Sequence, residues 1–230
     1  MSQQLTEELV PSDLGTLEYW EKTYALEIEN FKDHGDVGEV WFGSNSTGRV
    51  VRFINTNLGL DKTSDRLIDL GCGNGVLLAE LAQVGFENLV GVDYSAKAIE
   101  LARRVLDEKG FSKIKLFVYD VLCDSTDPDT NELGKPFALA HDKGTYDAVS
   151  LCPDKPRDKR VRYVKNVHRI LKDDGYLVLT SCNWTKAELT NHLCDYFELV
   201  DEIPTKSFSF GGQTGSRITQ LIFKKKNLVT

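Results

Sequence analysis

A glycine-rich stretch in the first half of the chain has the residue types of a ligand-binding turn. It reads Asp69-Leu70-Gly71-Cys72-Gly73-Asn74-Gly75 and follows a short apolar run. Glycines at this spacing let the backbone turn tightly and approach a ligand closely, and a helix that starts after Gly75 presents free N–H groups. The G-x-G-x-G spacing differs from the G-x-G-x-x-G of sites that bind a dinucleotide pyrophosphate. Asp69, just before the turn, suits a cofactor that carries an ammonium group.

Two more acidic residues stand where the next strands are predicted to end. Asp93 follows Gly71 by 93 − 71 = 22 residues, an offset typical of an acid that hydrogen-bonds both hydroxyls of a ribose. The side chain of Asp120 could accept from an adenine amino group, while the backbone N–H of Val121 donates to the ring. The structural alternatives are a helix N-cap for Asp93 and a strand-end turn for Asp120. With the glycine turn, these residues predict S-adenosylmethionine as the cofactor.

The stretch His141-Asp142-Lys143-Gly144-Thr145-Tyr146-Asp147 follows the fourth predicted strand, beside the expected reacting centre. Methyl transfer from a sulfonium depends mainly on the placement of the nucleophile, and an amine must be neutral to attack. Asp142 could hold an ammonium group and help it to lose its proton, so it is the candidate catalytic residue. Lys143 could contact the cofactor, for example through its backbone. We expect Asp147 to cap a helix or to lie buried in a turn, and His141 to be a packed strand histidine.

Composition argues against several other classes of protein. The 230 residues carry a net charge of −7, which disfavours nucleic acid as the direct substrate because an acidic chain repels phosphates. No apolar run approaches the roughly 18 residues of a membrane span, and the polar N-terminus is not a secretory signal. The five cysteines are scattered without a CxxC pair, so we expect no metal site and reduced thiols in the cytoplasm. Nothing in the sequence suggests an obligate assembly, and we expect a monomer.

Hydrophobic periodicity separates an N-terminal part from a larger cofactor-binding domain. Residues 1–13 are polar and acidic and are predicted to be disordered. Residues 14–60 contain two predicted helices, over 14–34 and from about 44–47 to 58, and residues 61–230 form the domain. The aromatic residues Tyr19, Trp20, Tyr24 and Trp41 either belong to the core under the sheet edge or form a lid that meets a cationic cofactor through cation–π attraction.

Strands and helices alternate from residue 66 onwards. Strands are predicted over 66–70, 88–92, 113–119, 137–141 followed by 146–151, 176–181 and 197–202, and helices over 76–84, 96–109, 158–171 and 186–194. Residues 207–210 and 218–224 are predicted to pair as an antiparallel hairpin around a glycine-rich turn. The pattern predicts an α/β fold, a doubly wound, seven-stranded and mostly parallel sheet with an antiparallel last strand. In such a Rossmann-like sheet the ligand lies beyond the carboxyl ends of the strands.

With these motifs in place, the chain resembles the small eukaryotic lysine methyltransferases that act on translation elongation factor one alpha, within the class I seven-stranded methyltransferase superfamily. The resemblance spans roughly residues 15 to 225. Its matching stretches are 19–24, 36–43, the glycine turn, 91–95, 142–148, 181–186 and 208–212. The Ser-Cys-Asn-Trp-Thr-Lys stretch at 181–186 and the Phe-Ser-Phe-Gly-Gly stretch at 208–212 are the most particular of them.

The resemblance implies methyl transfer from S-adenosylmethionine to a lysine of elongation factor one alpha, by the domain at 61–230 under a helical lid at 14–60. The cofactor contacts that it implies come from Trp20, Tyr24, Trp41, Gly71, Asp93, Tyr94, Asp120, Val121 and Lys143, to which the glycine turn adds Asp69 and Gly73. Asp142, Trp184 and Phe208 would border the lysine channel. The chain departs from many amino-methylating enzymes in one respect, because it lacks their Asn-Pro-Pro-Tyr-type loop after the fourth strand.

Three other functions are compatible with parts of the sequence. A small-molecule methyltransferase of the same fold would need a closed pocket rather than an open groove. A non-catalytic binding module would have kept the fold without binding the cofactor. A nicotinamide dehydrogenase is disfavoured by the G-x-G-x-G spacing. The sequence contains no signal for the position of the modified lysine or for the number of methyl groups added.

Overall fold

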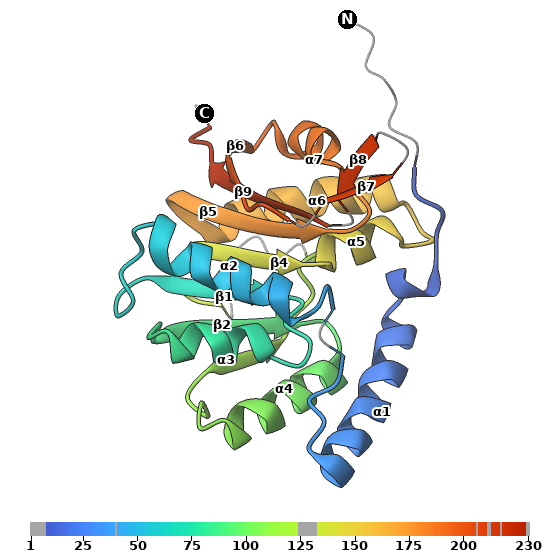
Figure 1. The fold of residues 1–230 in the computed structure, drawn as a ribbon, viewed down its shortest axis with the longest axis vertical. Coiled ribbons are helices and arrows are strands. Elements are labelled where there is room, and N and C mark those ends of the chain that lie inside the picture. The colour runs from blue at the N-terminus through green and yellow to red at the C-terminus, as the bar shows by residue number, and fades with distance from the viewer. Residues whose placement is uncertain are drawn as a thin grey trace, which may run out of the picture.

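A seven-stranded sheet runs through the middle of the computed structural model, which describes residues 8–39, 41–123, 133–205, 207–210, 213–216 and 218–228 (Figure 1). The strand order is β3-β2-β1-β4-β5-β9-β6. Its strands are β1 (Arg66–Leu70), β2 (Asn88–Asp93), β3 (Lys115–Val118), β4 (Phe137–Lys143), β5 (Leu171–Ser181), β6 (Phe197–Glu202) and β9 (Thr219–Lys225). Strand β9 pairs antiparallel with β5 and β6, while β1 to β5 pair in parallel. This confirms the predicted doubly wound sheet with an antiparallel last strand.

Helices cover both faces of this sheet, so its strands are apolar on both sides. One face carries α2 (Ser44–Asn57), α3 (Val76–Gln83) and α4 (Ala96–Glu108), which pack side chains such as Ile54, Leu78 and Leu106 into one core cluster. The other face carries α5 (Thr145–Ser150), α6 (Pro156–Ile170) and α7 (Lys186–Leu193), with Tyr163 and Leu189 in a second cluster. Among the described helices, none has the length and apolar character needed to cross a bilayer.

The order of the strands reverses at β1, and this reversal positions the site. Strand β1 has β2 on one side and β4 on the other, with all three parallel. The connections that leave β1 and β4 therefore run to opposite faces, and a crevice opens between them at the carboxyl ends of the strands. The glycine turn, which we define as residues 71–75, follows β1, and α5 follows β4. These two connections form opposite walls of the crevice.

Two predictions about local structure are wrong. The apolar run 146–151 was predicted as a strand but lies almost entirely in helix α5. The helix starts after Gly144, which has a φ of 88°. Its first N–H groups donate to the carboxylate of Asp142. The predicted terminal hairpin also pairs differently. Strand β7 (Ser207–Phe210) pairs with β8 (Gln213–Ser216), inside the stretch predicted as a turn, whereas β9 enters the main sheet.

Helix α1 (Leu17–His34) stands beside the sheet and packs on α4 (Figure 1). Its N-terminus is capped by the side chain of Thr16, which accepts from the N–H of Tyr19, and it ends at Gly35 in the left-handed conformation. The contact with α4 is a small apolar cluster of Ile28 with Leu101 and Val105. The position of the whole helix over the carboxyl edge of the sheet therefore depends on a few buried side chains.

The segment before α1 also makes specific contacts. Both guanidinium nitrogens of Arg160 donate to the carboxylate of Glu8, at 2.9 and 2.7 Å. The N–H of Ser12 donates to the carbonyl of Leu151 at 3.1 Å, and a short 3-10 helix (Asp13–Gly15) follows. Residues 8–13 were predicted to be disordered, but in the structure they make these contacts. An ion pair to the buried Arg160 and a backbone hydrogen bond hold the segment in place. Residues 1–7 lie outside the described residues.

The contact between α1 and α4 leads to a first prediction. Replacing Ile28, which is 3% exposed, with alanine should lower the free energy of unfolding by about 2 kcal/mol or more, because it opens a cavity in the cluster. It should also weaken cofactor binding, since α1 carries Trp20 and Tyr24 over the crevice. Thermal denaturation and calorimetry with S-adenosylhomocysteine measure the two effects. The control is Leu26→Ala on the same helix, where the side chain is 68% exposed and both values should stay unchanged.

Candidate active site

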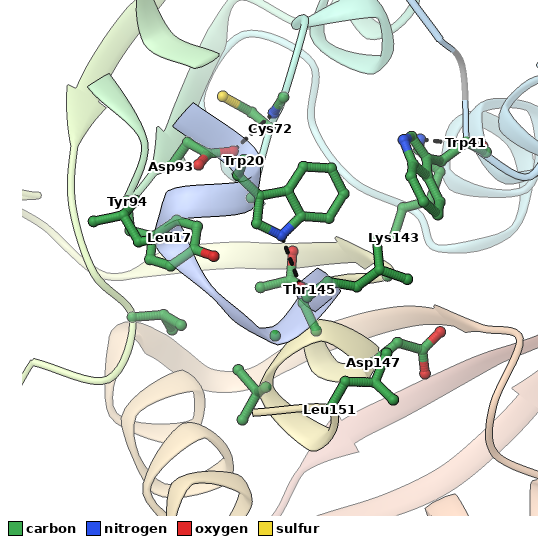
Figure 2. Close-up of a pocket in the computed structure, with 18 of the residues that line it drawn as sticks. Leu17, Trp20, Trp41, Cys72, Asp93, Tyr94, Lys143, Thr145, Asp147 and Leu151 are labelled. Carbon is green, nitrogen blue, oxygen red and sulfur yellow. Dashed lines mark hydrogen bonds between the residues drawn. The ribbon is translucent and has the colours of Figure 1, made fainter. Parts of the chain in front are cut away.

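A cavity of about 720 Å³ lies at the carboxyl ends of β1, β2, β4 and β5, under α1. Its lining includes all the sequence-predicted cofactor residues, namely Trp20, Tyr24, Trp41, Asp69, Gly71, Gly73, Asp93, Tyr94, Asp120, Val121 and Lys143. Figure 2 shows Trp20 in the middle, with Asp93 and Tyr94 on one side and Trp41 and Lys143 on the other. The structure therefore brings these residues, which come from separate segments of the chain, to one cavity.

The glycine turn has a conformation that other residues adopt only with strain. Gly71, Gly73 and Gly75 have φ angles of 66°, 53° and 73°. A Cβ atom on Gly71 would overlap the hydroxyl oxygen of Thr145, and one on Gly73 would come within 2.8 Å of the hydroxyl of Tyr24. Glycine is favoured at both positions because φ is positive and because a Cβ atom would collide with Thr145 or Tyr24.

Asp93 is buried at the end of β2 with spare hydrogen-bonding capacity on both oxygens. One oxygen accepts the N–H of Gly73 at 3.1 Å and the other the N–H of Ser95 at 3.0 Å. A carboxylate has about four acceptor positions, so each oxygen can accept one more hydrogen bond, as a vicinal diol requires. Burial raises the pKa of Asp93 to about 6, although these two N–H groups favour its charged form.

Asp69 is held by a histidine on the neighbouring strand. Asp69 on β1 and His141 on β4 are register partners, and the distance between Asp69 Oδ1 and His141 Nδ1 is 2.8 Å. Both side chains are almost fully buried, as expected for a packed strand histidine. Among the described residues, the Nε2 atom of His141 has no hydrogen-bond partner. The pair fixes the rotamer of Asp69 beside the glycine turn.

The remaining predicted cofactor residues form the far end and the roof of the cavity. Asp120 follows β3, where one of its oxygens accepts the N–H of Leu122 at 2.8 Å, and the side chain of Val121 packs into the core. In the roof, the indole of Trp20 stacks on Tyr24 with ring centroids 5.8 Å apart and meets Trp41 edge-on at 5.4 Å. Trp20, Tyr24 and Trp41 line the cavity, Tyr24 also packs against the cluster around Ile28, and Tyr19 is not among the lining residues.

Lys143 lies in the cavity wall at the end of β4. Its ammonium group donates to the carbonyl of Trp41 at 3.3 Å, which ties the roof to the sheet. Burial lowers the pKa of Lys143, although the nearby carboxylates of Asp69 and Asp142 favour its charged form.

Asp142, the predicted catalytic residue, does not line the cavity. It is 0% exposed, and its oxygens accept from the N–H groups of Thr145 and Tyr146 at 3.0 Å each and from the hydroxyl of Tyr163. Burial raises its pKa to about 8. Asp142 therefore caps the N-terminus of α5. It cannot contact a methyl acceptor directly, because protein atoms surround its side chain completely.

Two other residues predicted near the acceptor have different outcomes. Trp184 is buried, donates from its indole N–H to the hydroxyl of Ser150 at 3.0 Å, and packs α7 against α5 rather than lining the cavity. The side chain of Phe208 lies outside the described residues.

The cavity lining also contains residues to which the sequence motifs assign no clear site role. Thr145 donates from its hydroxyl to the carbonyl of Leu70 at 2.7 Å and packs against Gly71. Asp147, expected only in a cap or turn, faces the cavity from α5, and the exposed residues Cys182 and Asn183 follow β5 at the rim. The sequence carries no spacing signal for Asp147, because it lies two residues beyond Thr145 and therefore about half a turn away, on a different face of the helix.

These residues fit S-adenosylmethionine on two observations. The glycine turn lines the cavity at Gly71 and Gly73 without a side chain, which permits close approach of the methionine part to the backbone. Asp93 is a buried carboxylate whose two oxygens each keep room for one hydroxyl. The residues at the ends of the neighbouring strands add acceptors for an ammonium group and for an adenine.

Comparison with known proteins gives matches over most of the chain. Residues 61–227 match a family model described as a methyltransferase domain. The chain is 45% identical over 217 residues to EEF1A lysine methyltransferase 2 of Homo sapiens, covering 94% of this chain and 88% of the human protein. It is 37% identical over 234 residues to the protein-lysine N-methyltransferase EFM4 of Saccharomyces cerevisiae, covering 97% of this chain and 100% of the yeast protein.

Solved structures share the fold at low sequence identity. The magnesium protoporphyrin IX methyltransferase ChlM from Synechocystis PCC 6803, solved with bound SAM, has a TM-score of 0.64 at 17% identity and covers 95% of this chain and 100% of its own. The N-methyltransferase NodS from Bradyrhizobium japonicum, solved with S-adenosyl-L-homocysteine, has a TM-score of 0.63 at 16% identity. The match covers 93% of this chain and 100% of the NodS chain.

Fold and site together define an S-adenosylmethionine-dependent methyltransferase. Within that class, the chain belongs to the family of protein-lysine methyltransferases that includes EEF1A lysine methyltransferase 2 and EFM4. The resemblance inferred from the sequence motifs is thereby confirmed.

The burial of Asp93 predicts a pH dependence of cofactor binding. A carboxyl group with a pKa of about 6 is protonated below that pH and then loses the charge that strengthens its hydrogen bonds to a ribose. The affinity for S-adenosylhomocysteine should therefore be constant well above pH 6 and should fall by up to about tenfold per pH unit below it. Calorimetry across this range measures it. Asp93→Asn should bind weakly without this step, whereas the same step in Asp93→Asn would assign the titration to another group.

The glycine turn predicts a contrast between two substitutions. Gly71→Ala should abolish measurable cofactor binding, because its Cβ collides with Thr145 and its φ is 66°. Gly59 has a similar φ of 62°, but a Cβ added there would meet no atom within 4 Å. Gly59→Ala should therefore cost only the backbone strain, about 1 kcal/mol, and should leave cofactor affinity unchanged. Equal effects of both substitutions on binding would contradict the close approach at Gly71.

Proposed function

We propose that this protein transfers methyl groups from S-adenosylmethionine to a lysine side chain of translation elongation factor 1A. The observation that carries the proposal is a single cavity that joins the cofactor residues to an opening at the exposed residues Cys182 and Asn183. An opening of this kind suits a side chain presented by a protein surface. Relatives named EEF1A lysine methyltransferase 2 support the choice of acceptor protein.

Residues at the ends of different strands would bind different parts of the cofactor. Asp93 would receive the ribose hydroxyls, and Asp120 with the N–H of Val121 would hold the adenine. The bare backbone of the glycine turn would border the methionine part, with Asp69 beside its ammonium group. When bound, S-adenosylmethionine supplies an electrophilic methyl group on a positively charged sulfur.

The N-terminal residues 14–60 would act as a lid over this site. Trp20, Tyr24 and Trp41 present aromatic faces to the cavity, and such faces attract a sulfonium or an ammonium ion. The lid is anchored on two sides, by the cluster around Ile28 on α4 and by the hydrogen bond from Lys143 to the carbonyl of Trp41. Closure by these groups would exclude water from the reacting centre and orient the cofactor.

The residues of the chain act mainly by placement. An in-line displacement needs the nucleophilic nitrogen to lie on the far side of the transferred methyl group, and holding it there supplies most of the acceleration. We infer a cytoplasmic site of action from the proposed acceptor, a translation factor, and action as a monomer without nucleic acid as a direct substrate. The five thiols of the chain are compatible with that compartment because none is paired in a disulfide.

Intact-mass analysis tests the proposed reaction. Elongation factor 1A purified from cells that lack this enzyme should gain the mass of one or more methyl groups after incubation with the enzyme and S-adenosylmethionine. Peptide mapping should locate them on a lysine. Asp93→Ala should abolish the shift because the ribose contact is lost, whereas the control Asp107→Ala, at an exposed position of α4, should leave it intact. An unmodified factor with a wild-type enzyme that binds the cofactor would exclude this acceptor.

A further inference from the structure

Asp147 is a buried carboxylate in the cavity wall to which the cofactor assignment gives no role. It lies on α5 and is 4% exposed. One oxygen accepts the hydroxyl of Ser181 at 2.6 Å, and the other accepts the N–H of Cys182 at 2.9 Å. Both donors come from the end of β5 and the residue after it. The carboxylate is thus held rigidly, but by neutral groups.

The described part of the chain offers Asp147 no direct cationic partner, although Lys143, Lys159 and Arg162 line the same cavity. The described ion pairs do not include Asp147, and its interactions are with Ser181, Cys182 and Asn183. Burial raises the pKa of Asp147, the direction expected when a carboxylate is desolvated without a counter-ion. A buried charge of this kind is costly unless a cation pairs with it. A cationic ligand would supply the missing partner.

The position of Asp147 relates it to both ends of the cavity. Thr145, two residues earlier on α5, packs against Gly71 of the glycine turn. On the other side, Asp147 bonds to the N–H of Cys182, which is exposed at the rim. Figure 2 shows Asp147 beyond Thr145, on the side of the cavity away from Asp93 and Tyr94. Asp147 therefore lies between the cofactor residues and the opening to solvent.

The other acidic residues of the cavity are less suited to an acceptor. Asp69, Asp93 and Asp120 are engaged at the glycine turn and at the ribose and adenine positions. Glu39 and Asp154, which also line the cavity, are exposed, and the side chain of Asp154 is 75% exposed, so solvent would screen their charges. Asp142 is sealed beneath α5.

We propose that Asp147 binds the acceptor lysine: its carboxylate receives the ammonium group, which loses one proton to solvent at the opening, and then holds the neutral nitrogen with its lone pair toward the transferred methyl group. This inference rests on the proposed lysine methylation and assigns a catalytic residue to it. A lysine side chain entering past Cys182 and Asn183 would meet the carboxylate inside the cavity. Its N–H groups would fill the acceptor positions that Ser181 and Cys182 leave open. Asp142 then acts as a positioning residue, because it fixes the helix that carries Asp147.

A pair of bisubstrate probes tests the role of Asp147 without the elongation factor. In both probes a nitrogen replaces the cofactor sulfur and carries a short alkyl arm in place of the methyl group. The arm ends in an ammonium group in one probe and in a methyl group in the other. Calorimetry should show that the wild-type enzyme binds the ammonium probe about tenfold or more tightly than the methyl probe, since the ion pair is desolvated.

Asp147→Asn should lose this preference while keeping its affinity for the methyl probe and its melting temperature. The control Asp158→Asn, at an exposed position in the first turn of α6, should keep the preference. A merely structural role for Asp147 would instead lower the affinity for both probes equally. A preference retained in Asp147→Asn would overturn the assignment.

A crystal structure of the wild-type enzyme with the ammonium probe provides a test that needs no variant. The probe nitrogen should lie within hydrogen-bond distance of the Asp147 carboxylate, and a nitrogen bound elsewhere would overturn the proposal even if Asp147→Asn fails to fold. Neither result depends on the acceptor protein. A failed mass assay on elongation factor 1A with a positive probe result would therefore reject the acceptor protein and keep Asp147.

Discussion

The capping of α5 by Asp142 is the interaction on which the geometry of the site depends. A fully buried carboxylate at the end of β4 accepts the first N–H groups of the helix and the hydroxyl of Tyr163. These bonds set the direction in which α5 leaves the sheet. That direction places Thr145 against the glycine turn and Asp147 at the end of β5. The glycine turn and the end of β5 are thus aligned by one helix terminus, because the same short helix contacts both.

Several groups that attract a cation surround the cavity. Asp69, Asp93, Asp120 and Asp147 approach it from four strand or helix ends, and aromatic rings form its roof. Buried carboxylates are unfavourable in an empty cavity, and the raised pKa of Asp93 is one sign of that cost. A sulfonium cofactor with an ammonium group, followed by an ammonium acceptor, would relieve it. Lys143, Lys159 and Arg162 also line the cavity, so the carboxylates favour a cation where they approach the cavity rather than throughout it.

Much of this arrangement could be predicted from the sequence, because acids that end parallel strands meet at one edge of the sheet. This rule brings Asp69, Asp93 and Asp120 together, and the cavity contains all three. The sequence could not predict that Asp147 lines the cavity whereas Asp142 is buried beneath α5. This difference depends on where α5 begins, which the left-handed conformation of Gly144 sets. The sequence also did not predict that β9 pairs with β5 and β6. These strands lie farther away in the sequence than β7, with which a local hairpin was predicted.

The insertion of β9 between β5 and β6 has a consequence for biosynthesis. The last strand to be made is the one that joins β6 to the rest of the sheet, because β6 pairs with β9 alone. A nascent chain that lacks β9 therefore exposes the unpaired edge of β5 and leaves β6 detached. Open edges of this kind invite pairing between chains. Termination of synthesis before β9, even after the residues that line the cavity have been made, would yield an aggregation-prone product rather than a slightly shortened enzyme.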